Sequence, residues 1–282
     1  MIGKYMVALI TPFTNRNTVD IDSLKALVNK LLQQGADGFV VCGTTSEVCT
    51  LSDEERELVI DTVVDVCDGR CAIWVGCGTN CTIQSMKYIR MVEDKKIDGI
   101  MLVVPYYNRP SQEGLYQHFY YLSTHTRFPI MLYNVPKRTG VNLEIDTIEK
   151  LVSSCKNIVA IKQASSDFTI CEILNKYGVK VLCGEDGLLK ECLECGGYGI
   201  VSVVGHVDLP LIVSIISKFD LGNSIEDLDR ILKFKSSMVF VEGNPSGIKY
   251  LLYKCGLIEG KLRLPLCEVS EYAKKILDAY FD

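Results

Sequence analysis

Eight short apolar runs, each followed by a longer amphipathic stretch, limit the fold of this chain more than any other feature. The runs are YMVALI, GFVVC, AIWVG, DGIMLVV, PIMLYNV, NIVAIK, VKVLCG and GIVSVV. They are rich in β-branched residues and almost continuously apolar, which is typical of parallel strands covered on both faces. The stretches between them have the length and apolar spacing of helices. Eight such units predict a (β/α)₈ barrel.

A doubly wound open sheet is the alternative for alternating strands and helices. Such a sheet usually has a glycine-rich dinucleotide-binding turn after its first strand. Here that turn is TPFTNRN, which favours the barrel. From about Ser224 the alternation stops and three helical patterns follow. We therefore expect a barrel over residues 1–223 and a C-terminal helical region over residues 224–282.

The composition argues against nucleic acid and membranes as partners. The apolar content is 48%, the charged content 23% and the net charge −5, so the chain lacks the basic surface that polyanions attract. No segment approaches the roughly 20 apolar residues of a membrane span, and the N-terminal apolar stretch is too short for a secretory signal. We expect a cytoplasmic protein.

The 13 cysteines are scattered through the predicted strands and helices. This distribution indicates small buried hydrophobic residues rather than a disulfide framework. Cys192 and Cys195 form a C-x-x-C pair, but no second pair stands at zinc-binding spacing. We expect no metal site.

The residues that follow each apolar run are the candidates for chemistry, because active sites of such barrels lie at the carboxyl ends of the strands. These positions are Thr11, Pro12, residues 43–47, Gly76, Gly78, residues 105–108, Tyr133, Asn134, Arg138, Lys162, residues 184–186, Gly205 and His206. They bring together one amine, several hydroxyls and one arginine. They contain no carboxylate pair for glycoside hydrolysis and no serine beside a histidine. The set favours Schiff-base chemistry.

Lys162 is the amine of this set, and it ends the apolar run Ile158-Val159-Ala160-Ile161. Burial removes water from an ammonium group and so favours the free base, which can attack a ketone carbon. A lysine at a strand end that extends into solvent is the alternative. The surrounding motifs decide between the two.

Four motifs in order resemble one family. GTTSE, PYYNRPSQEG, YNVPKRTG and the lysine of NIVAIKQAS are similar to the 4-hydroxy-tetrahydrodipicolinate (dihydrodipicolinate) synthases of lysine and diaminopimelate biosynthesis. The likeness spans nearly the whole chain and extends to the terminal LRLPLCEVSE. It implies a lyase of the pyruvate-dependent class I aldolase type, which joins pyruvate to L-aspartate 4-semialdehyde through a covalent imine on the barrel lysine and uses no other cofactor.

The resemblance assigns roles to the catalytic residues. Lys162 would form the imine with pyruvate. Tyr133 would be the general acid and base beside it, linked through Thr45 to Tyr107. Tyr107 would enter from a neighbouring subunit, which requires at least a dimer, and the family implies a homotetramer made of two such dimers.

The resemblance also assigns the residues that hold the substrates. Thr44 and Thr45 would bind the carboxylate of pyruvate, and Gly184 and Val201 would line the pocket. Arg138 would bind the carboxylate of aspartate semialdehyde, because a guanidinium pairs with a carboxylate through two parallel hydrogen bonds. The sugar-acid lyases of the same superfamily generally lack this arginine.

Three departures from the family pattern bear on these roles. Gln163 follows the lysine where the synthases usually have glutamate, so we expect a changed electrostatic field at Lys162. Ser46 stands where glycine is common, and a left-handed backbone there would strain the loop. Residues 244–247 read NPSG instead of NPIP, a change that we expect to affect the helical region rather than the chemistry.

Many relatives have a regulatory site for lysine at a subunit interface. Its counterparts here are Val48, Cys49, Asp53, Arg56, Asn80, Gln84 and Tyr106. Asn80 and Tyr106 match the family pattern, but Gln84 replaces the glutamate that would pair with the ammonium of the ligand, and Asp53 and Arg56 replace histidines. We expect a vestigial site and weak or absent inhibition by lysine.

Two other functions remain open at this point. The departures at Ser46 and Gln163 would also suit a pyruvate-dependent aldolase for a sugar acid, similar to the sialic-acid lyases. A barrel that has lost turnover and only binds a keto acid is the other alternative, although it leaves the amine, the tyrosines and the arginine unexplained.

Overall fold

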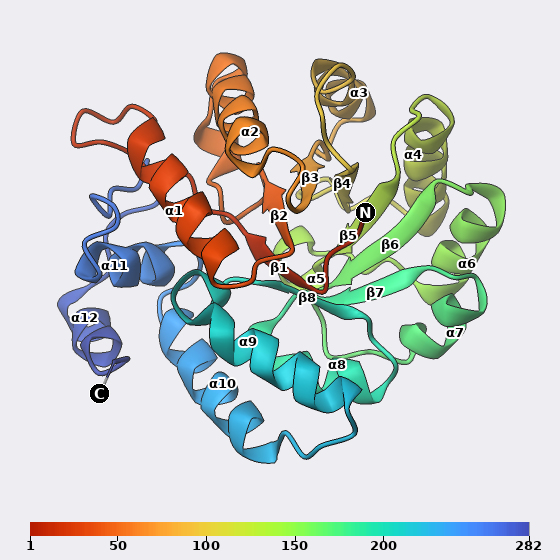
Figure 1. Cartoon of the computed structure of the whole chain (residues 1–282). Helices are drawn as coiled ribbons and strands as arrows, with labels where there is room; N and C mark the ends of the chain where they lie inside the picture. The colour runs from red at the N-terminus through yellow and green to blue at the C-terminus, as the bar shows by residue number, and fades with distance from the viewer. Residues whose placement is uncertain (282) are drawn as a thin grey trace.

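The computed structural model describes residues 1–281, and its strands form a closed eight-stranded barrel in sequence order (Figure 1). Every neighbouring pair of strands is parallel. The strands are β1 (Tyr5–Ala8), β2 (Gly38–Val41), β3 (Ala72–Gly76), β4 (Gly99–Val103), β5 (Ile130–Asn134), β6 (Ile158–Gln163), β7 (Lys180–Cys183) and β8 (Gly199–Ser202). The predicted (β/α)₈ barrel is therefore confirmed, with helices interleaved between the strands.

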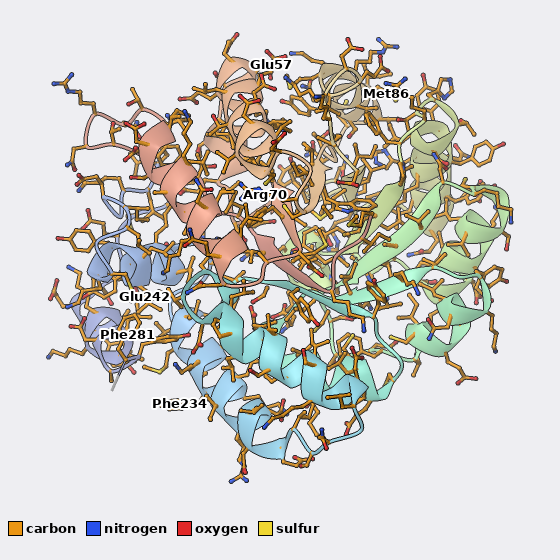
Figure 2. The ribbon with its side chains drawn as sticks, in the orientation of Figure 1. Glu57, Arg70, Met86, Phe234, Glu242 and Phe281 are labelled. Atoms are coloured by element: carbon orange, nitrogen blue, oxygen red, sulfur yellow. The ribbon has the colours of Figure 1, made fainter. Side chains whose placement is uncertain are left out.

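The helices form a layer around the barrel (Figure 1). They are α1 (Ile21–Gln33), α2 (Asp53–Cys67), α3 (Thr82–Met91), α4 (Gln112–Thr124), α6 (Ile145–Ser154), α7 (Ile170–Lys176), α8 (Leu189–Glu194) and α9 (Gly205–Asp220). Their apolar faces pack on the strands, whereas polar side chains such as that of Glu57 on α2 point outward (Figure 2). Two short 3₁₀ helices, Val48–Thr50 and Asp186–Leu188, lie in loops after β2 and β7.

A one-turn helix, α5 (Pro136–Thr139), carries the predicted substrate-binding Arg138. Pro136 stands at its start, where the missing N–H of proline costs no helical hydrogen bond. Gly140 ends it in the left-handed conformation, with φ at 74°. In Figure 1 this helix lies near the centre of the barrel rather than in the outer layer.

Three helices follow the barrel, as the sequence predicts: α10 (Glu226–Val239), α11 (Ser246–Lys254) and α12 (Glu271–Asp278). The helix α11 packs against α9, α10 and α12, and the chain between α11 and α12 returns toward the loops after β1 and β2. The division at residue 223 into two domains stays a prediction. Among the residues described, no helix has the length and apolar character needed to cross a membrane.

The register of the strands decides which side chains share a face. Tyr133 on β5 aligns with Lys162 on β6, and Asn134 aligns with Gln163. Successive side chains of a strand point to opposite faces of the sheet. Tyr133 and Lys162 therefore share the face toward the barrel interior, while Asn134 and Gln163 share the face toward the helices.

Candidate active site

Lys162 and Tyr133 lie side by side inside the barrel. The Lys162 Nζ atom is 4.4 Å from the centroid of the Tyr133 ring. Both residues are buried, with 6% and 5% of their surface exposed. The amine is thus held beside a phenol and away from bulk water, so the solvent-extended position considered from the sequence does not occur.

Tyr133 lines a cavity of about 300 Å³, and Lys162, which is not itself among the lining residues, lies against the Tyr133 ring. Tyr133 lines it together with Thr44 from the loop after β2 and Arg138 from α5. Arg138 is exposed, and one of its Nη atoms donates a 3.4 Å hydrogen bond to the backbone oxygen of Asn244. The cavity therefore combines a hydroxyl, a phenol and a guanidinium within reach of a carboxylate-bearing ligand.

The Thr45 hydroxyl is bonded to the C-terminal region, and its predicted role in the relay stays a prediction. Its hydroxyl accepts a 2.8 Å hydrogen bond from the Nδ2 of Asn244, and the residue is 3% exposed. Thr44 lines the cavity with Tyr133, but Thr45 is not among the lining residues. Thr44 and Tyr133 therefore line one cavity, whereas the Thr45 hydroxyl is bonded to the C-terminal region.

Gly184 follows β7 and lies directly against the lysine. A Cβ atom at this position would come within 3.1 Å of the Cγ and Cε atoms of Lys162 and within 2.9 Å of the Cβ of Ala164. Only glycine leaves room for the extended lysine side chain there. Val201, on β8, is 1% exposed and belongs to the packed core rather than to the cavity lining.

Gln163 does not face the lysine amine, contrary to the expectation from the sequence. Its side-chain oxygen accepts from Asn134 at 3.2 Å, and its Nε2 donates to the hydroxyl of Ser165 at 2.8 Å and to the backbone oxygen of Asp167 at 3.1 Å. These contacts all lie on the helix-facing side of β6. Gln163 therefore fixes the loop after β6, and its neutral charge acts on the opposite side of the strand from Lys162.

Ser46 does not strain the loop after β2, which was the second expected consequence of the departures. The left-handed residues of this turn are Cys42 and Glu47, with φ at 56° and 53°, and Ser46 is not one of them. The Ser46 hydroxyl donates a 2.6 Å hydrogen bond to the backbone oxygen of Leu9. Serine here ties the loop to β1, a contact that glycine cannot make.

Asp186 adds a buried carboxylate behind the strand ends. It accepts hydrogen bonds from the Ser202 hydroxyl and from the backbone N–H groups of Val203, at 2.9 Å, and Val204, at 3.3 Å. Burial raises the pKa of this carboxyl, and the hydrogen bonds oppose the rise. Asp186 thereby joins the loops after β7 and β8 around the site.

Comparison with known proteins agrees with this geometry. Residues 1–281 match the model of the dihydrodipicolinate synthetase family. The chain belongs to this family. The 4-hydroxy-tetrahydrodipicolinate synthase of Methanocaldococcus jannaschii is 39% identical over 275 residues, which cover 96% of this chain and 94% of the relative.

Solved structures of the dihydrodipicolinate synthetase family superpose on the whole chain. The chloride-inhibited enzyme of Acinetobacter baumannii, complexed with pyruvate, has a TM-score of 0.95 at 33% identity and covers 100% of this chain and 98% of its own. A monomeric dihydrodipicolinate synthase variant has a TM-score of 0.95 at 35% identity, with 98% and 94% covered. Both matches show the same barrel with its C-terminal helices.

Tyr107, which the family resemblance places in a proton relay, points out of the barrel in the isolated chain. It is 90% exposed and does not line the cavity. Its backbone is left-handed, with φ at 74°, as is that of Arg109, with φ at 46°. Non-glycine residues in this conformation store strain and are frequently found at functional loops.

The counterparts of the family's regulatory site are only partly brought together. Four of the counterparts line the same cavity as Thr44, namely Val48, Cys49, Arg56 and Tyr106, whereas Asp53, Asn80 and Gln84 do not. Burial raises the pKa of Tyr106. Arg56 is 8% exposed, and its guanidinium carbon lies 3.9 Å from the centroid of the Tyr88 ring.

The sequence analysis missed the contribution of the C-terminal region to the site. Asn244 and Pro245, from the altered NPSG motif, line the cavity, and so do Pro265 and Leu266. The expectation that this motif affects only the helical region is therefore wrong. The sequence indicates this contribution in one way only, through the resemblance of the terminal LRLPLCEVSE to the family. That resemblance identifies the segment but does not show where it folds.

The cysteines of the described residues form no disulfide bonds. All 13 are free, and 8 of them are buried. Cys192 is buried and Cys195 is exposed, so the two thiols of the C-x-x-C pair face different environments. Within residues 1–281 no group of three or more histidine, cysteine or acidic side chains has the arrangement of a metal site.

Proposed function

We propose that this chain is a 4-hydroxy-tetrahydrodipicolinate synthase, which condenses pyruvate with L-aspartate 4-semialdehyde in lysine and diaminopimelate biosynthesis. The observation that carries the proposal is the buried amine of Lys162, which lies 4.4 Å from the ring centroid of Tyr133 beside a cavity that also contains Thr44 and Arg138. Family membership supports the same reaction.

The chemistry begins with attack of the Lys162 amine on the ketone carbon of pyruvate. Loss of water leaves an imine, which accepts electrons as a methyl proton departs and an enamine forms. The enamine carbon attacks the aldehyde carbon of the second substrate. The amine of that substrate then attacks the imine carbon, which closes the ring and releases Lys162. The imine formed on Lys162 serves as the electron sink, so the proposal invokes no further cofactor.

Proton transfer in these steps falls to Tyr133, whose phenol lies beside the amine. Thr44 lines the same cavity, so we assign to its hydroxyl the relay toward Tyr107 that the family resemblance places at Thr45. Thr45, held by Asn244, would support the loop whose hydroxyls and N–H groups bind the pyruvate carboxylate.

Arg138 is the proposed anchor for the carboxylate of aspartate semialdehyde. The side chain is exposed at the cavity and makes one long hydrogen bond, at 3.4 Å, to the backbone of Asn244. Its remaining N–H groups can therefore pair with a carboxylate through two parallel bonds.

The experiment that tests the imine is reduction with borohydride in the presence of pyruvate, followed by intact-mass analysis. We expect one reduced pyruvyl unit on the wild-type chain and none on Lys162→Ala. A wild-type chain without the adduct, or a Lys162→Ala variant that retains it, would overturn the proposal.

The acceptor is tested separately, because a sugar-acid aldolase would form the same adduct. A panel of aldehydes should show turnover with aspartate semialdehyde, and Arg138→Ala should raise its KM. Ser46 and Gln163 are the two departures that suggested other acceptors, and neither side chain points toward Lys162. Ser46 donates to the backbone oxygen of Leu9, and Gln163 faces the helices. Turnover of a sugar-acid aldehyde instead would favour the alternative.

We also propose that Tyr107 completes the relay of a second copy of the chain, which requires at least a dimer. Its 90% exposure and left-handed backbone support a role in contact with a partner. The homotetramer and the cytoplasmic location stay predictions. Sedimentation of the wild type should show an oligomer, and Tyr107→Phe should lower kcat without dissociating it; a fully active monomer would contradict this assignment.

A further inference from the structure

Glu47 links the pyruvate-binding loop to the rest of the molecule. It follows Thr44 and Thr45 in the turn after β2, and its backbone N–H donates a 3.1 Å hydrogen bond to the oxygen of Thr44. Its own backbone is left-handed, with φ at 53°. A shift of the Glu47 side chain therefore moves the short hydrogen-bonded turn that presents both threonines.

The Glu47 carboxylate is fully buried and is held from the C-terminal region. One oxygen pairs with the Nζ of Lys249 on α11, and both side chains have 0% exposure. The other oxygen accepts a 2.9 Å hydrogen bond from the backbone N–H of Arg263. Both acceptor atoms of this loop carboxylate are thus occupied by residues far along the chain.

Lys249 contacts three separate segments of the chain. Besides Glu47, its Nζ donates a 2.8 Å hydrogen bond to the backbone oxygen of Lys261 and lies 4.1 Å from the centroid of the Phe13 ring. Phe13 belongs to the loop after β1, and the guanidinium of Arg263 lies over the same ring at 4.2 Å. The loops after β1 and β2 and the segment after α11 therefore converge on this one amine.

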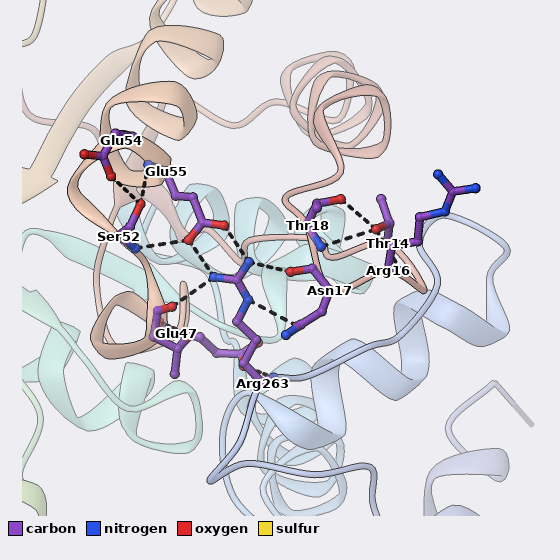
Figure 3. A network of polar contacts seen from close by, with 10 residues as sticks. Thr14, Arg16, Asn17, Thr18, Glu47, Ser52, Glu54, Glu55 and Arg263 are labelled. Carbon is purple, nitrogen blue, oxygen red and sulfur yellow. Dashed lines mark hydrogen bonds and ion pairs between the residues drawn. The ribbon is translucent and has the colours of Figure 1, made fainter.

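Arg263 also fixes the segment after α11, through contacts with α2 and with the loop after β1. Its guanidinium donates to both carboxylate oxygens of Glu55, each at 2.6 Å, and to the backbone oxygen of Asn17 at 2.6 Å (Figure 3). Two residues further on, Pro265 and Leu266 line the cavity. The network around Glu47 thus holds both the threonine turn and a part of the cavity lining.

Stability alone does not explain a fully buried pair at this place. Taking two charges out of water is costly, and apolar residues of similar volume often replace such a pair without loss. Burial lowers the pKa of Lys249 to about 8, although Glu47 opposes the shift. The charged amine is therefore kept at a cost, while its geometry, with three partners in three segments, specifies position.

We propose that Lys249 is a positioning residue, which sets the place of the pyruvate carboxylate by holding Glu47 and with it the turn of Thr44 and Thr45. This inference rests on the proposed function, because it assigns pyruvate to that turn. It predicts that loss of the pair weakens pyruvate binding and slows imine formation, while the affinity for the aldehyde, anchored at Arg138, changes little.

The test is the double variant Lys249→Met with Glu47→Gln, which removes both charges, keeps the volume and leaves no charge buried without a partner. We expect KM for pyruvate to rise about tenfold, with KM for aspartate semialdehyde within about twofold of wild type. The control is Lys254→Met with Asp278→Asn, which removes an exposed ion pair between α11 and α12 and should leave both KM values unchanged.

Two outcomes separate this inference from a merely structural role. A folded double variant with wild-type KM for pyruvate, or with both KM values raised equally, would overturn it. If that variant does not fold, Glu47→Gln alone decides. The amide keeps an acceptor for Arg263, and Lys249, whose pKa burial lowers to about 8, can lose its charge above that pH. A wild-type chain that forms no pyruvate adduct would instead refute the proposed function.

Discussion

Lys162 and Gln163 are neighbours in the sequence, but their side chains lie on opposite faces of β6. Lys162 is beside Tyr133 in the barrel interior, and Gln163 is bonded to Asn134, Ser165 and the backbone of Asp167 on the side of the helices. The residue next to Lys162 therefore acts on the position of a loop rather than on the charge of the amine.

This separation predicts that Gln163→Glu costs stability and leaves the chemistry unchanged. Glutamate lacks the Nε2 donor for Ser165 and Asp167, and it places a carboxylate at a site that is 4% exposed. We expect a loss of about 1–3 kcal/mol in the free energy of unfolding, measured in urea. The dependence of imine formation on pH should match that of the wild type.

The exposed Gln33 provides the control, because Gln33→Glu makes the same chemical change in water. It should alter neither the stability nor the pH profile. A shift of the pH profile in Gln163→Glu, with stability unchanged, would contradict the assignment of Gln163 to the loop.

The parts of the site that the sequence predicts are those governed by local pattern. Lys162 and Tyr133 end apolar runs, and an alternating chain of eight such runs places their ends together. Asn244 stands in the turn before α11 and Lys249 in an ordinary helical pattern, and their contacts with Thr45 and Glu47 span about 200 residues of sequence. Periodicity contains no information on such contacts, because it describes which face of a helix is buried and not what covers that face.

We expect a side chain at position 184 to slow catalysis by crowding Lys162. In Gly184→Ala the new Cβ would crowd the Cγ and Cε atoms of Lys162 at 3.1 Å. The lysine side chain would have to shift by a few tenths of an ångström, whereas a displacement of about 1 Å can lower a rate about 100-fold. We expect the rate of borohydride-trapped adduct formation to fall up to about 10-fold. Gly187→Ala is the matched control, since its Cβ would meet nothing closer than 3.6 Å; equal losses in both variants would refute the steric explanation.

Lysine should inhibit this enzyme weakly or not at all. A lysine ligand in this cavity would bring its ammonium group close to the Arg56 guanidinium. Glu47 is the acidic residue among the described lining residues, and its carboxylate is already paired with Lys249. A missing carboxylate partner for a buried ammonium costs about 2–5 kcal/mol. Steady-state assays with lysine up to the millimolar range measure this directly. Gln84→Glu combined with Arg56→His should increase the inhibition, and potent inhibition of the wild type would contradict the prediction.

We expect the buried His206 to make the free energy of unfolding depend on pH. Its Nε2 accepts a 3.1 Å hydrogen bond from the N–H of Ile10 and its Nδ1 is 2.8 Å from the oxygen of Val203, so the neutral ring satisfies both contacts. Burial lowers the pKa of His206 from 6.5 to about 4. As the pH falls below 6.5, His206 becomes protonated in the unfolded chain but stays neutral in the folded chain. The free energy of unfolding therefore decreases until the pH reaches about 4.

The comparison of His206→Gln with the wild type isolates this effect. Each unit of pKa difference corresponds to about 1.4 kcal/mol, so between pH 6.5 and pH 5 the wild type should lose about 1–2 kcal/mol more than the variant in urea unfolding. His125→Gln, at an exposed position, should retain the wild-type slope. The buried His118, whose pKa burial also lowers to about 4, contributes a similar slope in all three proteins and cancels from the comparison. Equal slopes for the wild type and His206→Gln would show that the ring is protonated in the folded state and that the contact with Ile10 is replaced at low pH.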